Sequence, residues 1–358
     1  METIDSKFRN WASQLETMMI KAFKGKRCEA SILQEKCKGK VIESHSISRK
    51  FLKSIANSNN EVYCFDNSLF TRLNNDGYPG IKKVGISKAS VYNMFCGLHD
   101  NELFLPIEDR VLIPDEEQCF WLFFRAIMME KYLKEAQVKH TNLMIDFFKN
   151  SLIEQKMSEI EEEFIRKCLI DKYRFLDGVN IAIKDMNYAL TDVIPIVDNK
   201  QYCKLHSLRI YFSKKTKILC AGVFHPEYDF YGNNINNLLS ETPIKDMISI
   251  SIVPLDGRIN QTNGCIVLSW IDTKTSSSCS RFIDSIRSIK NDQIINTLIY
   301  FIFEYCENIC ISPNWYENLD ETIKRQIIEL NMIQLHEPHP WNDIDFQGNE
   351  WKYLKKEY

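Results

Sequence analysis

Four side chains near the start of the chain have the chemistry of a zinc site. Cys28 and Cys37 occur in the stretch RCEASILQEKCKGK, and Cys96 and His99 occur in FCGLHDN. The Cys-x2-His pair is a good chelate, because a tight turn brings the ends of positions i and i+3 to one metal. Thiolates and imidazole suit tetrahedral Zn²⁺, and four protein ligands make a closed structural site. We therefore predict a structural zinc ion, the alternative being four unrelated side chains of a polar domain.

His45 is the next residue that could do chemistry. It lies eight positions after Cys37, in VIESHSISRKF, on a predicted strand. Read in order, Cys37, His45-Ser46-Ile47, Cys96-x2-His99 and Asp100-Asn101 resemble the treble-clef (ββα-metal) module of HNH nucleases. The resemblance covers roughly residues 25–110, and the remainder of the chain is not recognised.

The resemblance implies an active site. His45 would be the general base that activates water for attack on a phosphodiester. Asp100 stands where the family places a metal-binding His or Asn, and a carboxylate there suits Mg²⁺ or Mn²⁺. Asn93 or Asn101 would orient the base or complete the metal shell. Two alternatives stay open for His45, a hydrogen-bonded structural residue near the zinc or a zinc ligand itself.

The charge distribution favours an anionic partner. The whole chain has a net charge of −3, yet residues 21–53 hold ten cations against three acids. A positive segment on a near-neutral protein suggests nucleic acid, although a solvated lysine-rich surface explains it equally well. The side chains predicted to hold the phosphate backbone are Lys36, Lys38, Lys40, Arg49 and Lys50.

The pattern of apolar residues predicts an α+β chain. We expect an N-terminal helix in 1–24, the zinc-bound module in 25–113, a helical segment in 114–178 and a mixed strand and helix domain in 179–358. Asp115 is expected to cap the first long helix of the middle segment. The helical segment reads as an antiparallel pair and could serve a homo-oligomer. Neither GxxxxGK[ST] nor GxGxxG occurs, which excludes the commonest nucleotide-binding loops.

Composition bears on the compartment. The start of the chain lacks the apolar core of a signal peptide, and no window approaches about 18 uninterrupted apolar residues. Twelve cysteines without a secretion signal favour a reducing compartment over a disulfide framework. We therefore expect a cytoplasmic protein that does not enter the membrane.

The C-terminal half offers polar clusters without a clear reaction. FHPEYDF places His225, Glu227 and Asp229 at alternate positions, and we interpret them as part of a loop. Glu304 and Asn308, near the end of a predicted helix, are interpreted as structural. The leading hypothesis is a metal-dependent HNH-like endonuclease module joined to a recognition domain, an architecture similar to components of bacterial defence or toxin systems. The rival is a non-catalytic zinc-dependent protein that binds nucleic acid or protein.

Overall fold

The computed structural model describes residues 2–24, 27–33, 37, 39–154, 158–238, 240, 242–257, 262–271, 278–332, 340–341 and 353–358. It confirms the α+β class. The helices are α1 (Glu2–Ala22), α2 (Arg49–Ile55), α3 (Leu69–Asn74), α4 (Gly97–Leu103), α5 (Leu105–Glu108), α6 (Glu116–Glu154), α7 (Glu159–Asn199), α8 (Ser278–Arg287), α9 (Ile294–Tyr305), α10 (Pro313–Tyr316) and α11 (Glu321–Leu330), with 3-10 turns η1 (Glu29–Leu33) and η2 (Tyr202–Lys204).

The strands of these ranges form two antiparallel sheets. The smaller sheet pairs β1 (Val41–His45) with β4 (Val91–Cys96). The larger sheet has the order β10-β5-β8-β7-β6-β9-β2-β3. Its strands are β2 (Glu61–Asp66), β3 (Gly80–Gly85), β5 (Leu205–Phe212), β6 (Ile218–Phe224), β7 (Ile248–Pro254), β8 (Gly264–Ile271), β9 (Ile309–Ile311) and β10 (Tyr353–Glu357).

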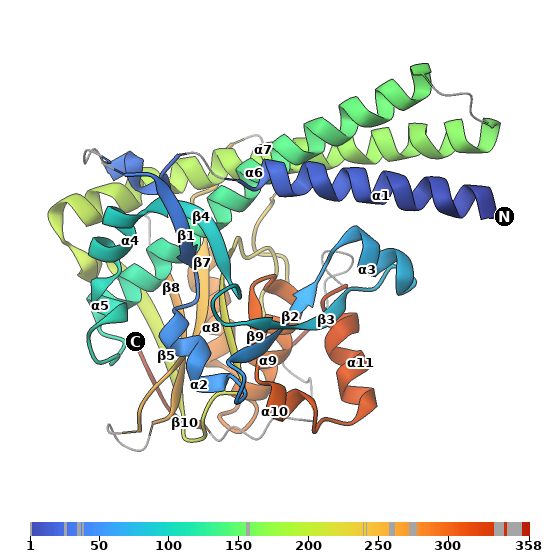
Figure 1. Cartoon of the computed structure of the whole chain (residues 1–358). Coiled ribbons are helices and arrows are strands. Elements are labelled where there is room, and N and C mark those ends of the chain that lie inside the picture. The colour runs from blue at the N-terminus through green and yellow to red at the C-terminus, as the bar shows by residue number, and fades with distance from the viewer. Residues whose placement is uncertain are drawn as a thin grey trace.

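The predicted helical middle forms two long helices, α6 and α7, with α1 lying beside them (Figure 1). The predicted cap is confirmed, since Oδ1 of Asp115 accepts a hydrogen bond from the backbone N–H of Gln118 at 2.8 Å. Ser158 caps α7 through a capping box with Glu161. Trp11 of α1 packs with Phe148 of α6 and Ile165 of α7 in a small separate core.

The expected boundary at residue 178 is wrong. The β-branched runs from Val179 to Asn199 read as two strands, but the structure continues α7 to Asn199. The side chains buried there are Val179, Asp185, Met186, Ala189, Leu190, Val193 and Ile196. Most of these residues are three, four or seven positions apart, which places them on one face of a helix. The helical pattern therefore outweighs the strand propensity of valine and isoleucine. The strands of the C-terminal part begin only at Leu205.

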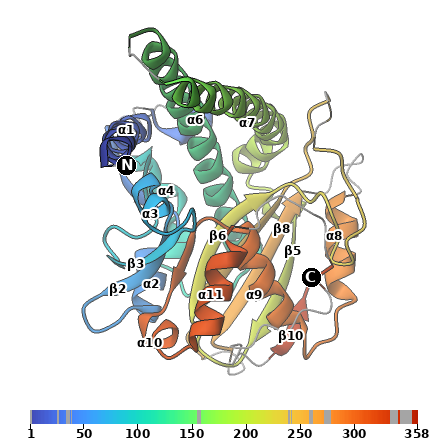
Figure 2. The ribbon, with the colours of Figure 1, turned by 90° about the vertical axis from the view of Figure 1, so that its right-hand side faces the viewer.

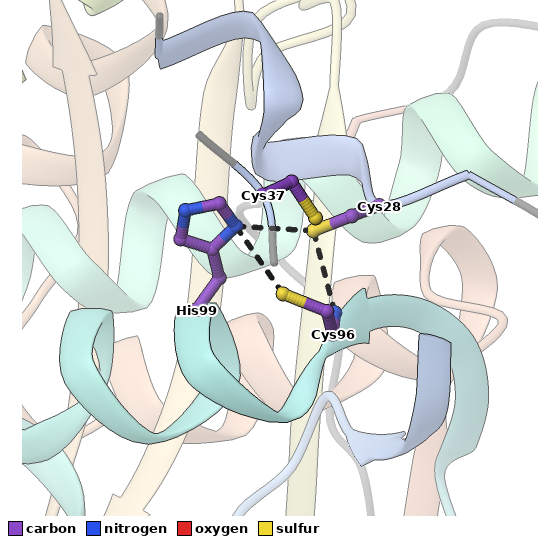
Figure 3. A group of neighbouring side chains, drawn as sticks. All are labelled: Cys28, Cys37, Cys96 and His99. Carbon is purple, nitrogen blue, oxygen red and sulfur yellow. Dashed lines mark hydrogen bonds between the residues drawn. The ribbon is translucent and has the colours of Figure 1, made fainter. Parts of the chain in front are cut away.

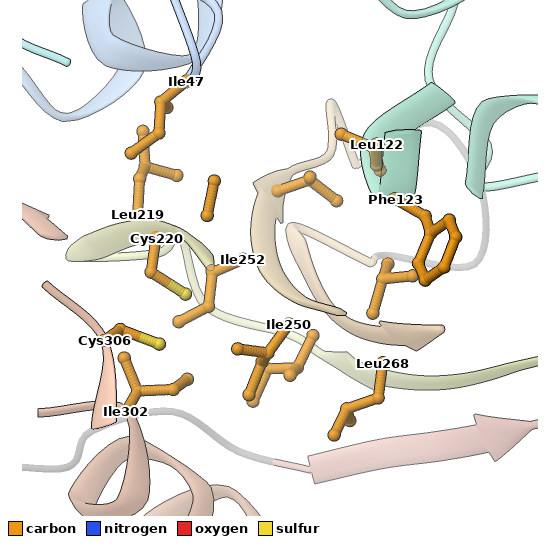
Figure 4. Packing of buried hydrophobic residues seen from close by; sticks show 14 of the residues in the cluster. Ile47, Leu122, Phe123, Leu219, Cys220, Ile250, Ile252, Leu268, Ile302 and Cys306 are labelled. Carbon is orange, nitrogen blue, oxygen red and sulfur yellow. The ribbon is translucent and has the colours of Figure 1, made fainter. Parts of the chain in front are cut away.

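The large sheet is covered on both faces. Every described position of β7 before Pro254 is buried, as expected when both faces meet helices. Figure 4 shows Leu219 pointing toward Ile47 of the N-terminal segment, while the next residue, Cys220, points toward Cys306. Helix α6 packs on one side and α9 on the other (Figures 2 and 4). One hydrophobic core therefore runs through the N-terminal segment, α6 and the C-terminal sheet.

The N-terminal segment also enters the large sheet. Strand β2 pairs with β3 on one side and with β9 on the other, where Tyr63 lies opposite Ile311 and Cys64 opposite Cys310. The segment expected as a module of its own, 25–113, is thus continuous with the C-terminal sheet. Within the described ranges, no helix is both long and apolar enough to cross a bilayer.

Candidate metal centre and catalytic cluster

The four predicted ligands come together. Cys28 precedes η1, Cys96 ends β4, and His99 lies in the first turn of α4 (Figure 3). The Nδ1 atom of His99 is 3.3 Å from Sγ of Cys28 and 3.5 Å from Sγ of Cys96. The four ligand atoms, including Sγ of Cys37, all lie within 4.8 Å of one another. Bond lengths of a tetrahedral zinc site imply a sulfur-to-nitrogen separation of about 3.5 Å. The donor set and its spacing therefore fit a closed site that can hold zinc.

Backbone amides donate hydrogen bonds to the sulfurs of Cys28 and Cys96. The N–H of Cys96 donates to Sγ of Cys28 at 3.3 Å. Burial raises the pKa of Cys28 to about 12, and the amides of Cys96 and Ala30 oppose that rise. Burial also acts to raise the pKa of Cys96, but hydrogen bonds from the amide of His99 and from neighbouring groups lower it overall. Amides directed at sulfur stabilise the thiolate, which is the form that binds metal.

Glycine at position 39 permits the close approach of the two halves of the cluster. A Cβ atom at Gly39 would lie 3.3 Å from Cβ of Cys96, tighter than an ordinary side-chain contact. The missing side chain at position 39 therefore lets the chain that carries Cys37 lie against the end of β4 without a shift of Cys96.

The two-stranded antiparallel sheet of β1 and β4 forms a compact arrangement with helix α4 around this centre. Val41, at the start of β1, pairs with Cys96, and His45, at its end, pairs with Val91. Helix α4 starts directly after Cys96 and packs on β1. Cys96 and the metal centre thus lie at one end of this two-stranded sheet and His45 at the other.

His45 is half-buried and is not a ligand of the Cys/His cluster. Its Nε2 atom lies 2.9 Å from the carbonyl oxygen of Ile86. A carbonyl only accepts, so Nε2 carries the proton, and in the neutral ring Nδ1 keeps its lone pair. No hydrogen bond to Nδ1 is found among the described residues.

Asp100 is half-buried and belongs to the same neighbourhood as His45. Burial raises the pKa of the Asp100 carboxyl. The guanidinium of Arg125, the Ser44 hydroxyl and the His45 imidazole each oppose that rise, while Glu108 adds to it. These interactions bring together residues of β1, α4, α5 and α6, which the sequence separates by up to 81 positions.

Arg125, which pairs with Glu108, is a functional candidate that the sequence analysis missed. Nη1 of Arg125 is 2.8 Å from Oε1 of Glu108, and the Ser48 hydroxyl donates to Oε2 at 2.6 Å. Arg125 is only 4% exposed at its side chain, whereas Glu108 is 33% exposed. The ion pair ties the segment after His45 to α6. No spacing pattern in the sequence indicates such a pair, because its members lie on different elements.

The remaining predicted residues divide into three groups. Among the described residues, neither Asn93 nor Asn101 makes a hydrogen bond with His45 or Asp100, and Asn101 is exposed on α4. The predictions for Lys36 and Lys38 fall outside the described residues. Lys40, Arg49 and Lys50 are exposed.

The three cations on α2, Arg49, Lys50 and Lys53, line an open hollow of about 540 Å³ that reaches Ile86, whose carbonyl oxygen accepts the hydrogen bond from His45. Lys50 also donates from Nζ to the backbone oxygen of Glu108 at 3.3 Å. The hollow therefore lies beside His45 and Glu108. Its lining residues are Arg49, Lys50, Lys53, Asn59, Asn60, Gly85, Ile86 and Ser87.

A buried hydrogen-bond network supports the loop that follows His45. Nδ2 of Asn308 donates to the Ser46 hydroxyl at 3.0 Å, and the Ser90 hydroxyl donates to Oδ1 of Asn308 at 2.9 Å. Asn308 also donates to the Ala221 oxygen of β6. The sequence interpretation of Asn308 as structural agrees with these contacts, but the sequence did not indicate that its partners flank His45.

Comparison with known proteins identifies no family for this chain. No protein-family model, no curated protein and no solved structure matches this chain.

Proposed function

We propose that this protein is a metal-dependent endonuclease with an HNH-like active site that hydrolyses phosphodiester bonds in nucleic acid. The observation that carries the proposal is the hydrogen bond from Nε2 of His45 to the Ile86 oxygen, since it leaves Nδ1 able to accept a proton. The Asp100 carboxyl shares this neighbourhood. An imidazole of fixed tautomer near a carboxylate and a basic hollow suits general-base attack on a phosphodiester.

Each residue then has a role in the reaction. Nδ1 of His45 accepts a proton from water while the water oxygen attacks phosphorus and the bond to the leaving oxygen breaks. Asp100 would hold Mg²⁺ or Mn²⁺ together with oxygens of the substrate and of water. When bound, that ion supplies charge that polarises the phosphate and stabilises the leaving oxygen. Arg125 lies near the Asp100 carboxyl and favours its ionised form.

The zinc ion proposed for the Cys/His cluster has a structural role. Four protein ligands leave no open position for water or substrate. Because Cys96 and His99 lie at the junction of β4 and α4, the ion would set the angle at which α4 crosses the sheet of β1 and β4. That angle determines how far Asp100 stands from His45.

The basic surface suggests how nucleic acid would be held. Arg49, Lys50 and Lys53 project from α2 into the hollow that reaches Ile86. Exposed cations bind phosphates of the backbone without reading bases, and they fix the register of the substrate. The hollow would therefore bring a phosphodiester beside His45.

One observation favours the rival function, a zinc-dependent protein that binds nucleic acid without cutting it. Among the described residues, the Cys/His cluster is the only group of three or more metal-binding side chains close enough to hold an ion. A second, catalytic ion would thus depend on ligands from the substrate, as Mg²⁺ sites with one or two carboxylates do.

The test is a cleavage assay with metal titration. Purified protein is incubated with plasmid DNA and with RNA over a range of Mg²⁺ and Mn²⁺ concentrations, and we expect cleavage products. His45→Ala should lower the rate by roughly 100- to 10,000-fold, the usual contribution of a general base. Its zinc content and melting temperature should stay unchanged, because His45 is only half-buried and is not in the Cys/His cluster.

His206→Ala is the matched control, since His206 is an exposed histidine on β5, away from the cluster. It should cut like the unaltered protein. Cleavage that survives His45→Ala would remove the mechanism. Salt-sensitive binding without cleavage at any metal concentration would favour the rival function.

A further inference from the structure

Two cysteines outside the metal centre lie next to each other on neighbouring strands of the large sheet. Cys64 of β2 and Cys310 of β9 are directly opposed partners in an antiparallel pair. Their Sγ atoms lie 3.7 Å apart, although the residues are separated by 246 positions in the chain. Directly opposed residues of antiparallel strands have Cα atoms about 4.5–5.5 Å apart, within the range that a disulfide spans.

The two thiols differ in access and in acidity. Cys310 is 1% exposed, whereas Cys64 is partly exposed. The hydrogen bond with Cys310 lowers the pKa of Cys64, burial opposes that effect, and the ammonium of Lys82 lowers the pKa further. The same hydrogen bond, together with burial, raises the pKa of Cys310 well above its usual value. The accessible member of the pair is therefore the better nucleophile.

We propose that Cys64 and Cys310 form a modification site at which a hydroperoxide produces an intramolecular disulfide between the N-terminal segment and the C-terminal sheet. In the first step, the Cys64 sulfur attacks hydrogen peroxide, the O–O bond breaks, and sulfenic acid and water form. In the second, the Cys310 sulfur displaces the hydroxyl of the sulfenic acid as a second water. Peroxide is reduced by two electrons, and a dithiol reductant restores both thiols.

The bond would add a covalent link between two parts of the molecule that otherwise meet through packing, strand pairing and side-chain hydrogen bonds. Strand β2 is followed by β3, which leads to Ile86, the residue whose carbonyl oxygen accepts the hydrogen bond from His45. Strand β9 directly follows Asn308, whose side chain forms hydrogen bonds with Ser46 and Ser90. A covalent link between β2 and β9 would therefore restrain the positions of both Ile86 and Asn308. The inference depends on the thiol geometry alone and stands whether or not the protein cuts nucleic acid.

The test uses the full-length, zinc-loaded protein. It is treated with hydrogen peroxide under native conditions, free thiols are alkylated after rapid denaturation in acid, and peptides are mapped by mass spectrometry without reduction. We expect a peptide pair joined through Cys64 and Cys310, loss of alkylation at both positions, and recovery of both after treatment with a dithiol. The oxidised protein should also melt at a higher temperature than the reduced protein.

Other cysteines of the chain provide the controls. Cys203 is exposed, so its oxidation confirms that the peroxide treatment worked. Cys220 and Cys306 are neighbours but both are buried, and they should stay reduced. Cys64→Ser should abolish the joined peptide and the rise in melting temperature, whereas Cys203→Ser should leave both unchanged.

If Cys64 and Cys310 remain alkylated while Cys203 is oxidised, the inference is wrong. It is also wrong if Cys64 is joined mainly to a cysteine of the metal centre. Both results come from the unaltered protein, so neither depends on whether the Cys64→Ser variant folds.

Discussion

The imidazole of His45 donates from Nε2 to the backbone oxygen of Ile86, 41 residues further along the chain, at 2.9 Å. The contact joins the end of β1 to the connection between β3 and β4. It fixes the ring and, in the neutral form, leaves the lone pair of Nδ1 directed elsewhere. The proposed catalytic role of His45 and the predictions on its surroundings follow from this relationship.

The first prediction concerns the metal centre. Purified protein should contain about one zinc ion per chain, and Cys96→Ser should lower that content and the melting temperature together. Structural zinc sites contribute binding free energy on the order of 10 kcal/mol to folding, so removal of a buried ligand is costly. Elemental analysis and thermal unfolding measure both effects. Cys119→Ser, which alters a buried thiol of α6, should keep the zinc; equal zinc loss in both variants would contradict the assignment.

The second prediction concerns Asp100. Asp100→Asn should lower the cleavage rate by at least about tenfold and raise the Mg²⁺ concentration needed for half-maximal activity, because the amide removes the charge that holds the ion. Zinc content should not change. Asp109→Asn replaces a nearby exposed acid and serves as the matched control. An unaltered metal dependence in Asp100→Asn would exclude Asp100 as a ligand of the catalytic ion.

The third prediction concerns the support of the loop after His45. Asn308→Ala leaves the buried hydroxyls of Ser46 and Ser90 without their amide partner. The free energy of unfolding should fall by about 1–3 kcal/mol, as usual when buried polar groups lose a hydrogen bond. Denaturant unfolding measures the loss. Asn318→Ala, at an exposed asparagine of the same half, should cost much less, and similar losses in the two variants would refute the role of the network.

The fourth prediction concerns nucleic-acid binding. The double variant Arg49→Ala/Lys53→Ala should bind nucleic acid more weakly and with a lower dependence on salt. Each phosphate contact contributes roughly 0.7–0.9 to the slope of log K against log salt, so the loss of two contacts should reduce the magnitude of the slope by about 1.4–1.8. Binding titrations at several salt concentrations measure it. Lys290→Ala/Arg325→Ala removes two exposed cations elsewhere, and an equal change there would indicate a non-specific charge effect.

Much of the local structure could be predicted from the sequence by itself. The soft ligands Cys28, Cys37, Cys96 and His99 are recognisable because few other residue types bind zinc, and the structure brings them within 4.8 Å of one another. The cap at Asp115 and the strands β5, β6, β7 and β8 were predicted because hydrogen-bonding side chains and apolar runs act over short stretches. The short strands β9 and β10 were not predicted. The extension of α7 to Asn199 was not predicted, because its valine and isoleucine runs suit strands and helices alike.

Only the tertiary structure decided what surrounds His45. The sequence placed His45 and Asp100 on different elements but contained no sign of the carbonyl of Ile86, the Glu108–Arg125 ion pair or the amide of Asn308. These partners lie 17 to 262 residues apart and meet because β2 joins β9 in one sheet and α6 crosses its face. Composition and periodicity report on neighbours along the chain, whereas packing of distant elements determines which polar groups share a buried site.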